Sequence, residues 1–367
     1  MNFLKRTWAE INLDNLAFNV NEIKSRLPKS TEMMAIVKAN AYGHGDKLIA
    51  NELQNMGINL FGVSNLEEAI SLRHADIKGD ILVLGSTPEN VAADIAEFNV
   101  TQAVYSPEYA QNLNAYAKSN NVTINCHLKI DTGMGRIGFN CDDIDEIIKA
   151  YNLSNLNFTG IFSHLSSADD LSDEGKEYTI SQIKKFDKVI SGLKENGINL
   201  KMKHLQNSAG ILNCSHLNYD MARAGIIIYG LGIDTYEGCD ITLKPVMELK
   251  SVVSMVKNVK KGDAISYSRK FVAEKDIRLA TVPIGYADGY LRAFSNTAKM
   301  IVSAISARSL KVISQSPPLP TTVTISPSLT SGISVTSKIS WSIHTEPVIF
   351  ANLPFTIILA VFENALK

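Results

Sequence analysis

A lysine that ends an apolar run is the first residue whose setting suggests chemistry. Lys38 closes the stretch Ala-Ile-Val-Lys, and Tyr42 and the turn Gly-His-Gly follow it. A lysine at the mouth of an apolar core loses hydration, which disfavours the charged amine and lowers its pKa. The neutral amine can attack an aldehyde and form a Schiff base. A lone lysine at a strand end is more often a surface residue, but the adjacent tyrosine and glycines favour the chemical interpretation.

A glycine-rich segment offers an arginine to an anion. Residues 131–139 read Asp-Thr-Gly-Met-Gly-Arg-Ile-Gly-Phe, with Arg136 inside a literal G-x-G-x-x-G. A dinucleotide site would also need an acidic residue about twenty positions further on, and residues 156–164 contain no carboxylate. We therefore interpret the segment as a loop that presents Arg136 to an anion such as a carboxylate.

Polar residues stand at the ends of three later apolar runs. Hydroxyl and backbone N–H groups at such ends are suited to holding a phosphate. Each residue alone has a plainer interpretation, since a serine often caps a helix and an arginine often forms a salt bridge. No two histidines have the helical spacing of metal ligands, so we expect no metal site. The residues are His164, Asn207, Ser208, Arg223, Gly225 and Ile226.

A tyrosine in the segment Ile-Ser-Tyr-Ser, Tyr267, is a candidate base. A strand tyrosine usually packs half-buried against its neighbours. To act as a base, its phenol, with an ordinary pKa of about 10, needs that pKa lowered, most simply by a nearby cation. The segment Gly-Tyr-Ala-Asp-Gly follows at 285–289.

The elements that must position these residues alternate along most of the chain. Eight extended apolar runs, separated by segments of helical period, predict a (β/α)₈ barrel over residues 1–235, with an open doubly wound sheet as the alternative. Residues 236–367 are expected to form a mainly β domain, with strands at 247–256 and 278–284 and a turn at 261–263. The eight runs are 33–38, 58–64, 81–85, 100–106, 122–131, 156–163, 200–206 and 221–229, and the clearest helical segments are 46–56, 66–75, 88–98, 107–120 and 142–151.

Composition indicates an ordinary globular protein. The 367 residues, with a net charge of −1 and 45% hydrophobic content, fit about two domains and provide no basic patch for nucleic acid or an anionic membrane. The four cysteines lack CxxC spacing, and the longest apolar run, 348–362, is too short to span a bilayer. Because the N-terminus lacks a signal-peptide pattern, we expect a cytoplasmic protein.

The last 67 residues differ from the rest. Residues 301–367 hold 12 Ser, 7 Thr and 6 of the 11 prolines, but one Gly and no Asp. Turns of a β domain usually need Gly, Asn or Asp. A mucin-like stalk, a degenerate segment and a stretch read in the wrong frame are the three interpretations, and we favour the last two. The β domain is therefore expected to be incomplete or aberrant after about residue 300.

Together, the motifs resemble those of bacterial alanine racemases, which are fold-type III pyridoxal-phosphate enzymes. The resemblance covers about residues 5–300 and rests on AIVKANAYGHG, DTGMGRIGF, HLQNSAG, RAGIIIYG, ISYS and GYADG, in family order. Family members continue with an Arg-Val-Cys-Met-Asp-type segment and, near the end, a tyrosine that helps to hold the phosphate. Both are missing after Met300, so we predict that this chain binds the cofactor weakly and racemises poorly.

The resemblance implies a role for each candidate residue. Lys38 would form a Schiff base with pyridoxal 5'-phosphate and act as the base on the D-alanine face, while Tyr267, lent by the partner subunit of a homodimer, would be the base for L-alanine. Arg136 would bind the substrate carboxylate, and Arg223 would contact the pyridine nitrogen. Lys129 matches a lysine that this family can carry as a carbamate. The remaining cofactor contacts implied are Tyr42, His164, Asn207, Ser208, Gly225 and Ile226.

The implied function is interconversion of L- and D-alanine, supplying D-alanine for peptidoglycan. Three alternatives stay open. One is a pyridoxal-phosphate-binding homeostasis protein without racemase activity, although such proteins lack the β domain and its Tyr267. The second is racemisation of another amino acid, such as serine, because an apolar pocket rejects an added hydroxyl by only about 10²-fold. The third is an inactive, degenerate racemase.

Overall fold

The computed structural model describes residues 6–232, 241–269, 271–289, 299–302, 311–313, 321–328, 332–339 and 358–362. The chain forms two compact units, Leu13–Lys244 and Met1–Asn12 with Pro245–Lys367. Each unit is described below by itself.

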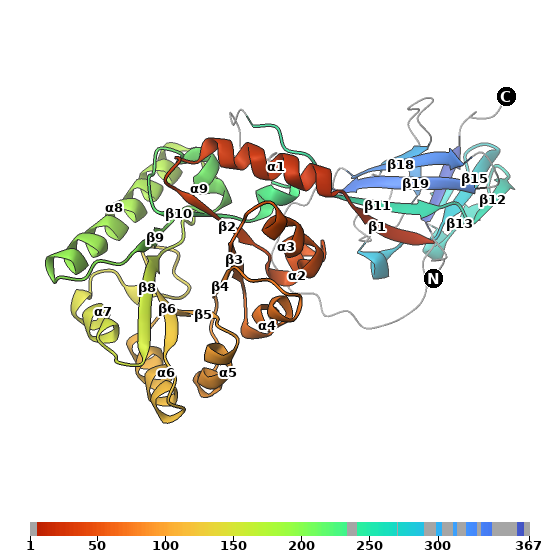
Figure 1. Ribbon diagram of the computed structural model, residues 1–367. Coiled ribbons are helices and arrows are strands. Elements are labelled where there is room, and N and C mark those ends of the chain that lie inside the picture. The colour runs from red at the N-terminus through yellow and green to blue at the C-terminus, as the bar shows by residue number, and fades with distance from the viewer. Residues whose placement is uncertain are drawn as a thin grey trace. The chain divides into compact units, whose positions relative to one another are not determined.

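The first unit is a closed barrel of eight parallel strands, labelled in Figure 1. Its strands pair in the order β5-β4-β3-β2-β10-β9-β8-β6, and β6 returns to β5. This closure confirms the barrel and removes the open doubly wound sheet from consideration. Each of the eight runs predicted from the sequence overlaps one of these strands. The bounds are β2 Glu32–Ile36, β3 Leu60–Val63, β4 Asp80–Val83, β5 Thr101–Val104, β6 Ile124–Asp131, β8 Leu156–Phe162, β9 Met202–His204 and β10 Met221–Ala224, with the short β7, Phe139–Asn140, beside β6.

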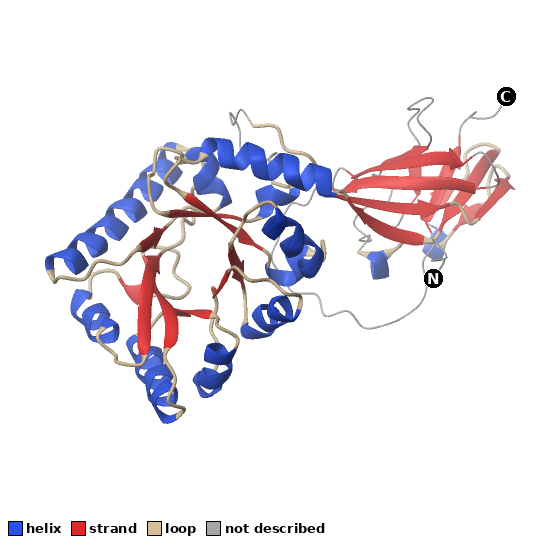
Figure 2. Cartoon of the chain, in the orientation of Figure 1, coloured by secondary structure: helices blue, strands red, loops and turns tan. Residues whose placement is uncertain are grey.

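Helices surround the strands, as the blue ribbons of Figure 2 show. Their starts follow capping chemistry: Ser106 accepts a hydrogen bond from the Tyr109 N–H ahead of Pro107, and Asn65 accepts one from the Glu68 N–H. The five predicted segments each contain a helix, whereas the sequence pattern did not single out α1 and α8. The bounds are α1 Leu13–Arg26, α2 Lys38–Tyr42, α3 Asp46–Asn55, α4 Leu66–His74, η1 Glu89–Val91, α5 Ala92–Glu97, α6 Pro107–Ser119, α7 Ile144–Tyr151, α8 Asp173–Glu195, α9 Ser208–Asn213 and η2 Ile226–Tyr229.

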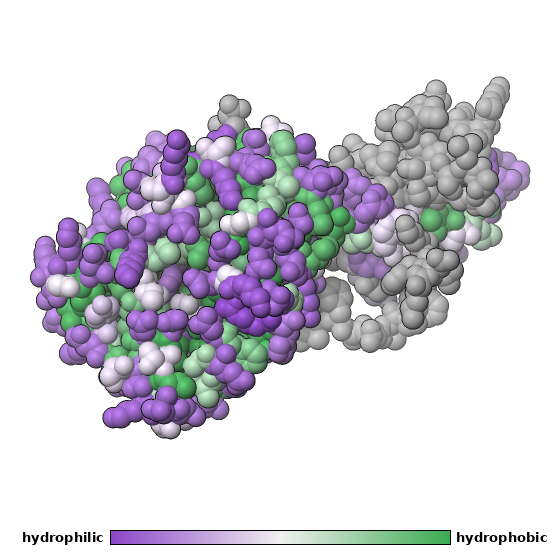
Figure 3. All heavy atoms as spheres, viewed as in Figure 1, coloured by the Kyte–Doolittle hydropathy of each residue, from purple (hydrophilic) through white to green (hydrophobic). Residues whose placement is uncertain are grey.

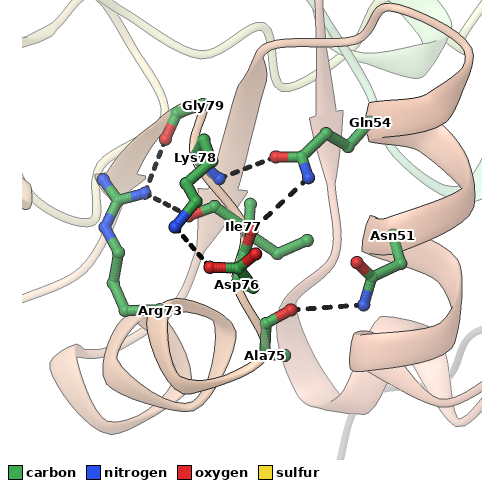
Figure 4. Close-up of polar contacts among 8 residues, drawn as sticks. All are labelled: Asn51, Gln54, Arg73, Ala75, Asp76, Ile77, Lys78 and Gly79. Carbon is green, nitrogen blue, oxygen red and sulfur yellow. Dashed lines mark hydrogen bonds and ion pairs between the residues drawn. The ribbon is translucent and has the colours of Figure 1, made fainter.

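One arginine fastens the loops at the end of the barrel where the strands begin. Arg73 Nη1 donates to the carbonyl oxygens of Ile77 and Gly79, each at 2.7 Å (Figure 4). Its Nε and Nη2 donate to Phe98 O and Asn99 O at 2.9 and 2.8 Å. Four loop carbonyls therefore depend on one side chain, far along the strands from the residues that could do chemistry.

The second unit is mainly β, as predicted, but it also takes in the N-terminal strand. β1 (Thr7–Ile11) pairs antiparallel with β11 (Met247–Val252), which the division at residue 235 did not indicate. The single strand expected at 247–256 is wrong, since β11 ends at Val252 and β12 (Met255–Val259) joins a different sheet. The remaining elements are β13 Ala264–Ile265, η4 Tyr267–Arg269, β14 Phe271–Val272, β15 Ile277–Val282, η5 Tyr286–Asp288, β16 Lys299–Val302, β17 Lys311–Ile313, β18 Thr321–Ser328, β19 Gly332–Ile339 and β20 Ile358–Phe362.

The surface of the barrel unit seen in Figure 3 is mostly hydrophilic, with scattered hydrophobic residues. Among the residues that the structure describes, no helix combines the length and apolarity needed to cross a bilayer. The same residues contain no group of His, Cys, Asp and Glu side chains arranged to hold a metal ion.

Candidate active site

Lys38 stands where strand β2 gives way to a left-handed turn. Ala39, Asn40, Ala41 and Tyr42 have φ angles of 52°, 54°, 52° and 53°. For residues with a Cβ, this conformation costs about 1–2 kcal/mol each. Four in succession store strain directly beside the lysine, and strained backbone of this kind persists only where its surroundings hold it.

Glu68 on helix α4 holds the turn. Its Oε1 accepts a hydrogen bond of 2.7 Å from the Ala39 N–H, and its Oε2 accepts bonds of 2.8 Å from the N–H and the hydroxyl of Ser64. The carboxylate thereby ties the ends of β2 and β3 together. His44 contributes from the other side, with Nδ1 3.0 Å from Ala41 O.

The pKa of the Lys38 amine is lowered. Burial is the largest cause, the positive charge of Arg136 adds to it, and Glu68 opposes it. The structure thus places Lys38 inside the mouth of the barrel and within electrostatic reach of Arg136. An amine with a depressed pKa is more often neutral and hence nucleophilic at neutral pH.

A cradle for an anion lies beside the turn. Ser208 Oγ accepts a hydrogen bond of 3.0 Å from the Gly225 N–H. A Cβ placed on Gly225 would come within 3.2 Å of the Tyr42 hydroxyl and 3.4 Å of Ser208 Oγ, so only glycine leaves this space open. Ser208 begins α9 after the seventh barrel strand, and Ile226 begins η2 after the eighth. Hydroxyls and helix N-termini at this position suit a phosphate.

Asn207 fixes the start of α9. Its Oδ1 accepts a hydrogen bond of 2.9 Å from the Gly210 N–H, and its Nδ2 donates to Leu165 O at 3.0 Å. The same Nδ2 lies 3.4 Å from His164 Nε2. Asn207 therefore joins the loop that carries Ser208 to the loop that carries His164.

Arg223 is buried without a carboxylate partner among the described residues. Its Nη2 donates to Ser163 O at 2.7 Å and to Leu205 O at 3.1 Å, and contacts His164 Nδ1 at 3.2 Å. Its Nη1 donates to His204 Nδ1 at 2.9 Å. Burial lowers the pKa of the guanidinium to about 9. These bonds lock the group in place as a donor.

The arginine also sets the tautomer of His204. Because Arg223 Nη1 donates to His204 Nδ1, that ring carries its proton on Nε2. His204 Nε2 then donates to His127 Nδ1 at 2.9 Å. Burial, followed by the charge of Arg223, holds the pKa of both His164 and His204 well below its usual range. All three rings are therefore neutral at pH 7, with burial and then Arg223 lowering the pKa of His127 to about 3.

The glycine loop presents Arg136 at the surface of the same mouth. Asp131 anchors the loop, since its Oδ1 accepts hydrogen bonds from the Gly133 and Gly135 N–H groups at 2.9 and 3.1 Å. Gly133, at φ +136°, leaves room for the Tyr178 hydroxyl, which donates to its carbonyl at 2.7 Å. Arg136 itself is exposed, as a residue that meets an incoming anion must be.

Lys129 adds a further basic group beneath the loop. It is 3% exposed, and its Nζ donates to Ile130 O at 3.2 Å. Burial and then the charge of Arg223 lower the pKa of Lys129 to about 7. The barrel mouth therefore gathers four basic residues, Lys38, Lys129, Arg136 and Arg223, all of which act on the pKa of His164. The carboxylates of Glu68 and Asp131 are both engaged by backbone N–H groups, so the site is suited to anionic ligands.

Tyr267 lies in the second unit. It begins η4 after Ser266, whose φ is +66°, and its side chain is 68% exposed. The structure does not relate it to Lys38. The predicted Gly-Tyr-Ala-Asp-Gly motif forms η5, where Asp288 Oδ2 accepts a hydrogen bond of 3.0 Å from the Gly285 N–H.

Sequence reasoning missed three residues that support the site. Glu68 lies in no motif. Asp131 and His204 lie in the motifs DTGMGRIGF and HLQNSAG, but the sequence pattern assigns neither residue a role of its own. A carboxylate directly before Gly-x-Gly is a usable signal for a loop anchor, because adjacent backbone N–H groups need an acceptor. No local signal could have found Glu68, whose partners are 29 and 4 residues away.

The comparison with protein families gives matches over both units. The alanine racemase N-terminal domain matches residues 11–232, and the alanine racemase C-terminal domain matches residues 246–315. The second match extends past residue 300, where the resemblance in the sequence was expected to end.

Similar proteins are found among curated and solved racemases. Alanine racemase 1 of Clostridium acetobutylicum is 39% identical over 303 residues, covering 82% of this chain and 78% of that protein. The alanine racemase of Clostridium tetani is 42% identical, also over 303 residues, with coverage of 82% and 77%. The solved alanine racemase of Clostridium difficile 630 superposes with a TM-score of 0.80 at 34% identity, covering 98% of this chain and 87% of that one. By fold, barrel site and relatives, the chain belongs to the alanine racemase family of amino-acid racemases, which depend on pyridoxal 5'-phosphate.

Proposed function

We propose that this barrel binds pyridoxal 5'-phosphate through Lys38 and serves the racemisation of alanine by a two-base mechanism. The observation that carries the proposal is the convergence of a buried amine of lowered pKa, an open cradle at Gly225 and a set of basic residues. When bound, the cofactor withdraws electrons from the substrate and acidifies its Cα–H.

The cradle fits the phosphate of this cofactor. The space that a Cβ on Gly225 would fill is bordered by the Tyr42 and Ser208 hydroxyls, and two helix N-termini open onto it. We assign phosphate contacts to these groups and to Ile226. Asn207 positions the Ser208 loop, and His164 lines the wall.

Arg223 would face the pyridine nitrogen. A guanidinium that is held by carbonyl oxygens and histidine nitrogens can donate a hydrogen bond but cannot accept a proton. It therefore leaves the ring nitrogen unprotonated, which makes the cofactor a weaker electron sink than a carboxylate partner would. Arg223 would thereby favour racemisation over transamination as a side reaction.

Proton transfer needs one base on each face of the substrate. We assign the D-alanine face to Lys38 and the L-alanine face to Tyr267 of a second copy of the chain. The exposed Tyr267 side chain supports this assignment, because a residue lent to a partner must project from its own unit. Arg136 would hold the substrate carboxylate. We further propose a homodimer in the cytoplasm that supplies D-alanine for peptidoglycan, supported by bacterial relatives named alanine racemase.

Exchange of the substrate α-hydrogen with D₂O tests the assignment of bases. With Tyr267→Phe, we expect D-alanine to go on exchanging while L-alanine stops, because each base serves one enantiomer. With Lys38→Ala, both exchanges stop. Tyr286→Phe is the matched control, since it is another half-exposed tyrosine of the second unit. Equal loss of both exchanges in Tyr267→Phe would refute the assignment, as would exchange that survives in Lys38→Ala.

A further inference from the structure

Two segments of the chain have amino-acid sequences that opposite strands of the same DNA could encode. Residues 291–302 read LRAFSNTAKMIV, and residues 356–367 read TIILAVFENALK. The genetic code relates them when one strand is read backwards with its frame offset by one base. In that register, each opposite-strand codon pairs with one codon of this chain. Its first base is the complement of that codon's second base, and its second base is the complement of that codon's first base.

The first two bases of each codon decide which residues the opposite strand allows. Ala (GC) gives Ala (GC), Thr (AC) gives Val (GT), Asn (AA) gives Phe (TT), Glu (GA) gives Ser (TC), and Ile (AT) gives Ile or Met (AT). Reading residues 356–367 backwards from Lys367 in this way allows Leu-Arg-Ala-Phe-Ser-Asn-Thr-Ala-Lys-Met-Ile-Val. All twelve positions agree with residues 291–302. The two segments therefore have the pattern of the arms of an inverted repeat.

The residues between the arms explain the unusual composition of the tail. Under the same rule, Ser codons of the TC type give Asp or Glu, Thr gives Val, and Pro gives Gly. Residues 303–355, with 12 Ser, 6 Thr, 6 Pro and no Asp, would thus become rich in Asp or Glu, Val and Gly. Those residues build turns and strands. Tyrosine codons begin with TA, and the rule then gives TA on the opposite strand, which begins two of the stop codons. No tyrosine follows Tyr290, so no codon after it forces this start onto the opposite strand.

The genetic code also allows most of the missing motif on the opposite strand. Residues 342–345 read Ser-Ile-His-Thr, and the rule allows Val-Cys-Met-Asp when they are read backwards. These are four of the five residues of the Arg-Val-Cys-Met-Asp-type segment that is missing after Met300, and Glu346 gives Ser in place of the Arg. The C-terminal family model ends its match at residue 315, before this segment.

We propose that the DNA between these arms is an invertible segment, that this chain is read from one orientation, and that the other orientation encodes an intact C-terminal domain. A recombinase that acts at the arms would break and rejoin both strands, so that the segment turns over with no base gained or lost. Inversion would then switch the second unit between two sequences while leaving the barrel and Tyr267 unchanged. This proposal concerns the gene and does not depend on the assigned catalytic roles.

Nucleotide sequencing and orientation-specific amplification test the proposal directly. In the register offset by one base, codons 291–302 should be the reverse complement of codons 356–367. This includes the third bases, which the protein sequence leaves open. Amplification with one primer outside the segment and one inside should yield products for both orientations from the descendants of a single cell. Third bases that disagree, a stop codon on the opposite strand, or a single orientation in every clone would each overturn it.

Expression of both orientations adds a protein readout. The chain from the opposite orientation should bind pyridoxal 5'-phosphate more tightly than this chain, measured by titration of its absorbance, and a larger fraction of it should elute as a dimer. If the two chains behave alike, the inversion has no effect on the protein and its role as a switch is refuted. Failure of racemase activity in both, with tight cofactor binding in one, would count against the proposed function alone.

Discussion

Removal of the Glu68 carboxylate should loosen the turn that carries Lys38 and Tyr42. The turn holds four residues at φ between 52° and 54°, a strain of about 4–8 kcal/mol in all. Glu68 opposes that strain through a 2.7 Å bond to the Ala39 N–H. A hydrogen bond to a charged group contributes about 1.5–3 kcal/mol. In Glu68→Ala, we therefore expect the Kd for pyridoxal 5'-phosphate to rise roughly 10- to 100-fold.

The free energy of unfolding should fall as well. Glu68→Ala also removes two bonds to Ser64, and for a half-buried carboxylate the total loss is about 2–4 kcal/mol. Urea unfolding followed by circular dichroism measures it, and titration of cofactor absorbance measures the Kd. Glu67→Ala is the matched control, because this exposed neighbour lies in the same first turn of α4. If both variants show the same stability and the same Kd, Glu68 does not hold the turn and the reasoning is refuted.

Three further changes should have measurable effects. Gly225→Ala would place a methyl group 3.2 Å from the Tyr42 hydroxyl, so cofactor Kd in the same titration should rise about tenfold or more. Gly192→Ala on α8, whose added Cβ meets the Ile144 side chain of α7, should leave Kd unchanged. Folding lowers the pKa of Lys129 from 10.5 to about 7, so the unfolded chain binds more protons than the folded chain between these pH values. The contribution of Lys129 to the free energy of unfolding therefore rises with pH. Lys129→Met should remove about 2 kcal/mol of the gain in stability to urea between pH 7 and 9. Arg73→Ala should lower the free energy of unfolding, measured by thermal unfolding, by about 2–4 kcal/mol, because four carbonyl oxygens lose their donor. Lys78→Ala is the control: it loses only an exposed ion pair and should lower the same free energy by less than about 0.5 kcal/mol. An Arg73 variant that melts like the Lys78 variant would show that the loops hold without it.

The barrel could be predicted because its strands are buried on both faces. All four residues of β3, Leu-Phe-Gly-Val, are buried, for example, so this strand is an unbroken apolar run. Periodicity detects such runs directly. The antiparallel strand β1 could not be assigned in this way, because it pairs with β11 some 240 residues later and its burial pattern does not distinguish the partner.

The site was predictable where a residue type is itself the chemistry. Lys38, Arg136, Ser208 and Arg223 have plainer interpretations when each is taken alone, but their amine, guanidinium and hydroxyl groups occur together in motifs at or near the ends of apolar runs. Their supporting residues act only through geometry. The link from Arg223 through His204 to His127 spans strands that are distant in sequence, so it could be found only in the folded chain.

Covalent capture of the cofactor tests the central claim most directly. Pyridoxal 5'-phosphate is added to the purified chain, borohydride is used to fix it, and the modified peptide is identified by mass spectrometry. We predict that the label lies on Lys38 and is lost in Lys38→Ala, since this amine combines a lowered pKa with a place beside the cradle. A label on Lys129 instead, the other lysine of lowered pKa at the barrel mouth, would contradict the account.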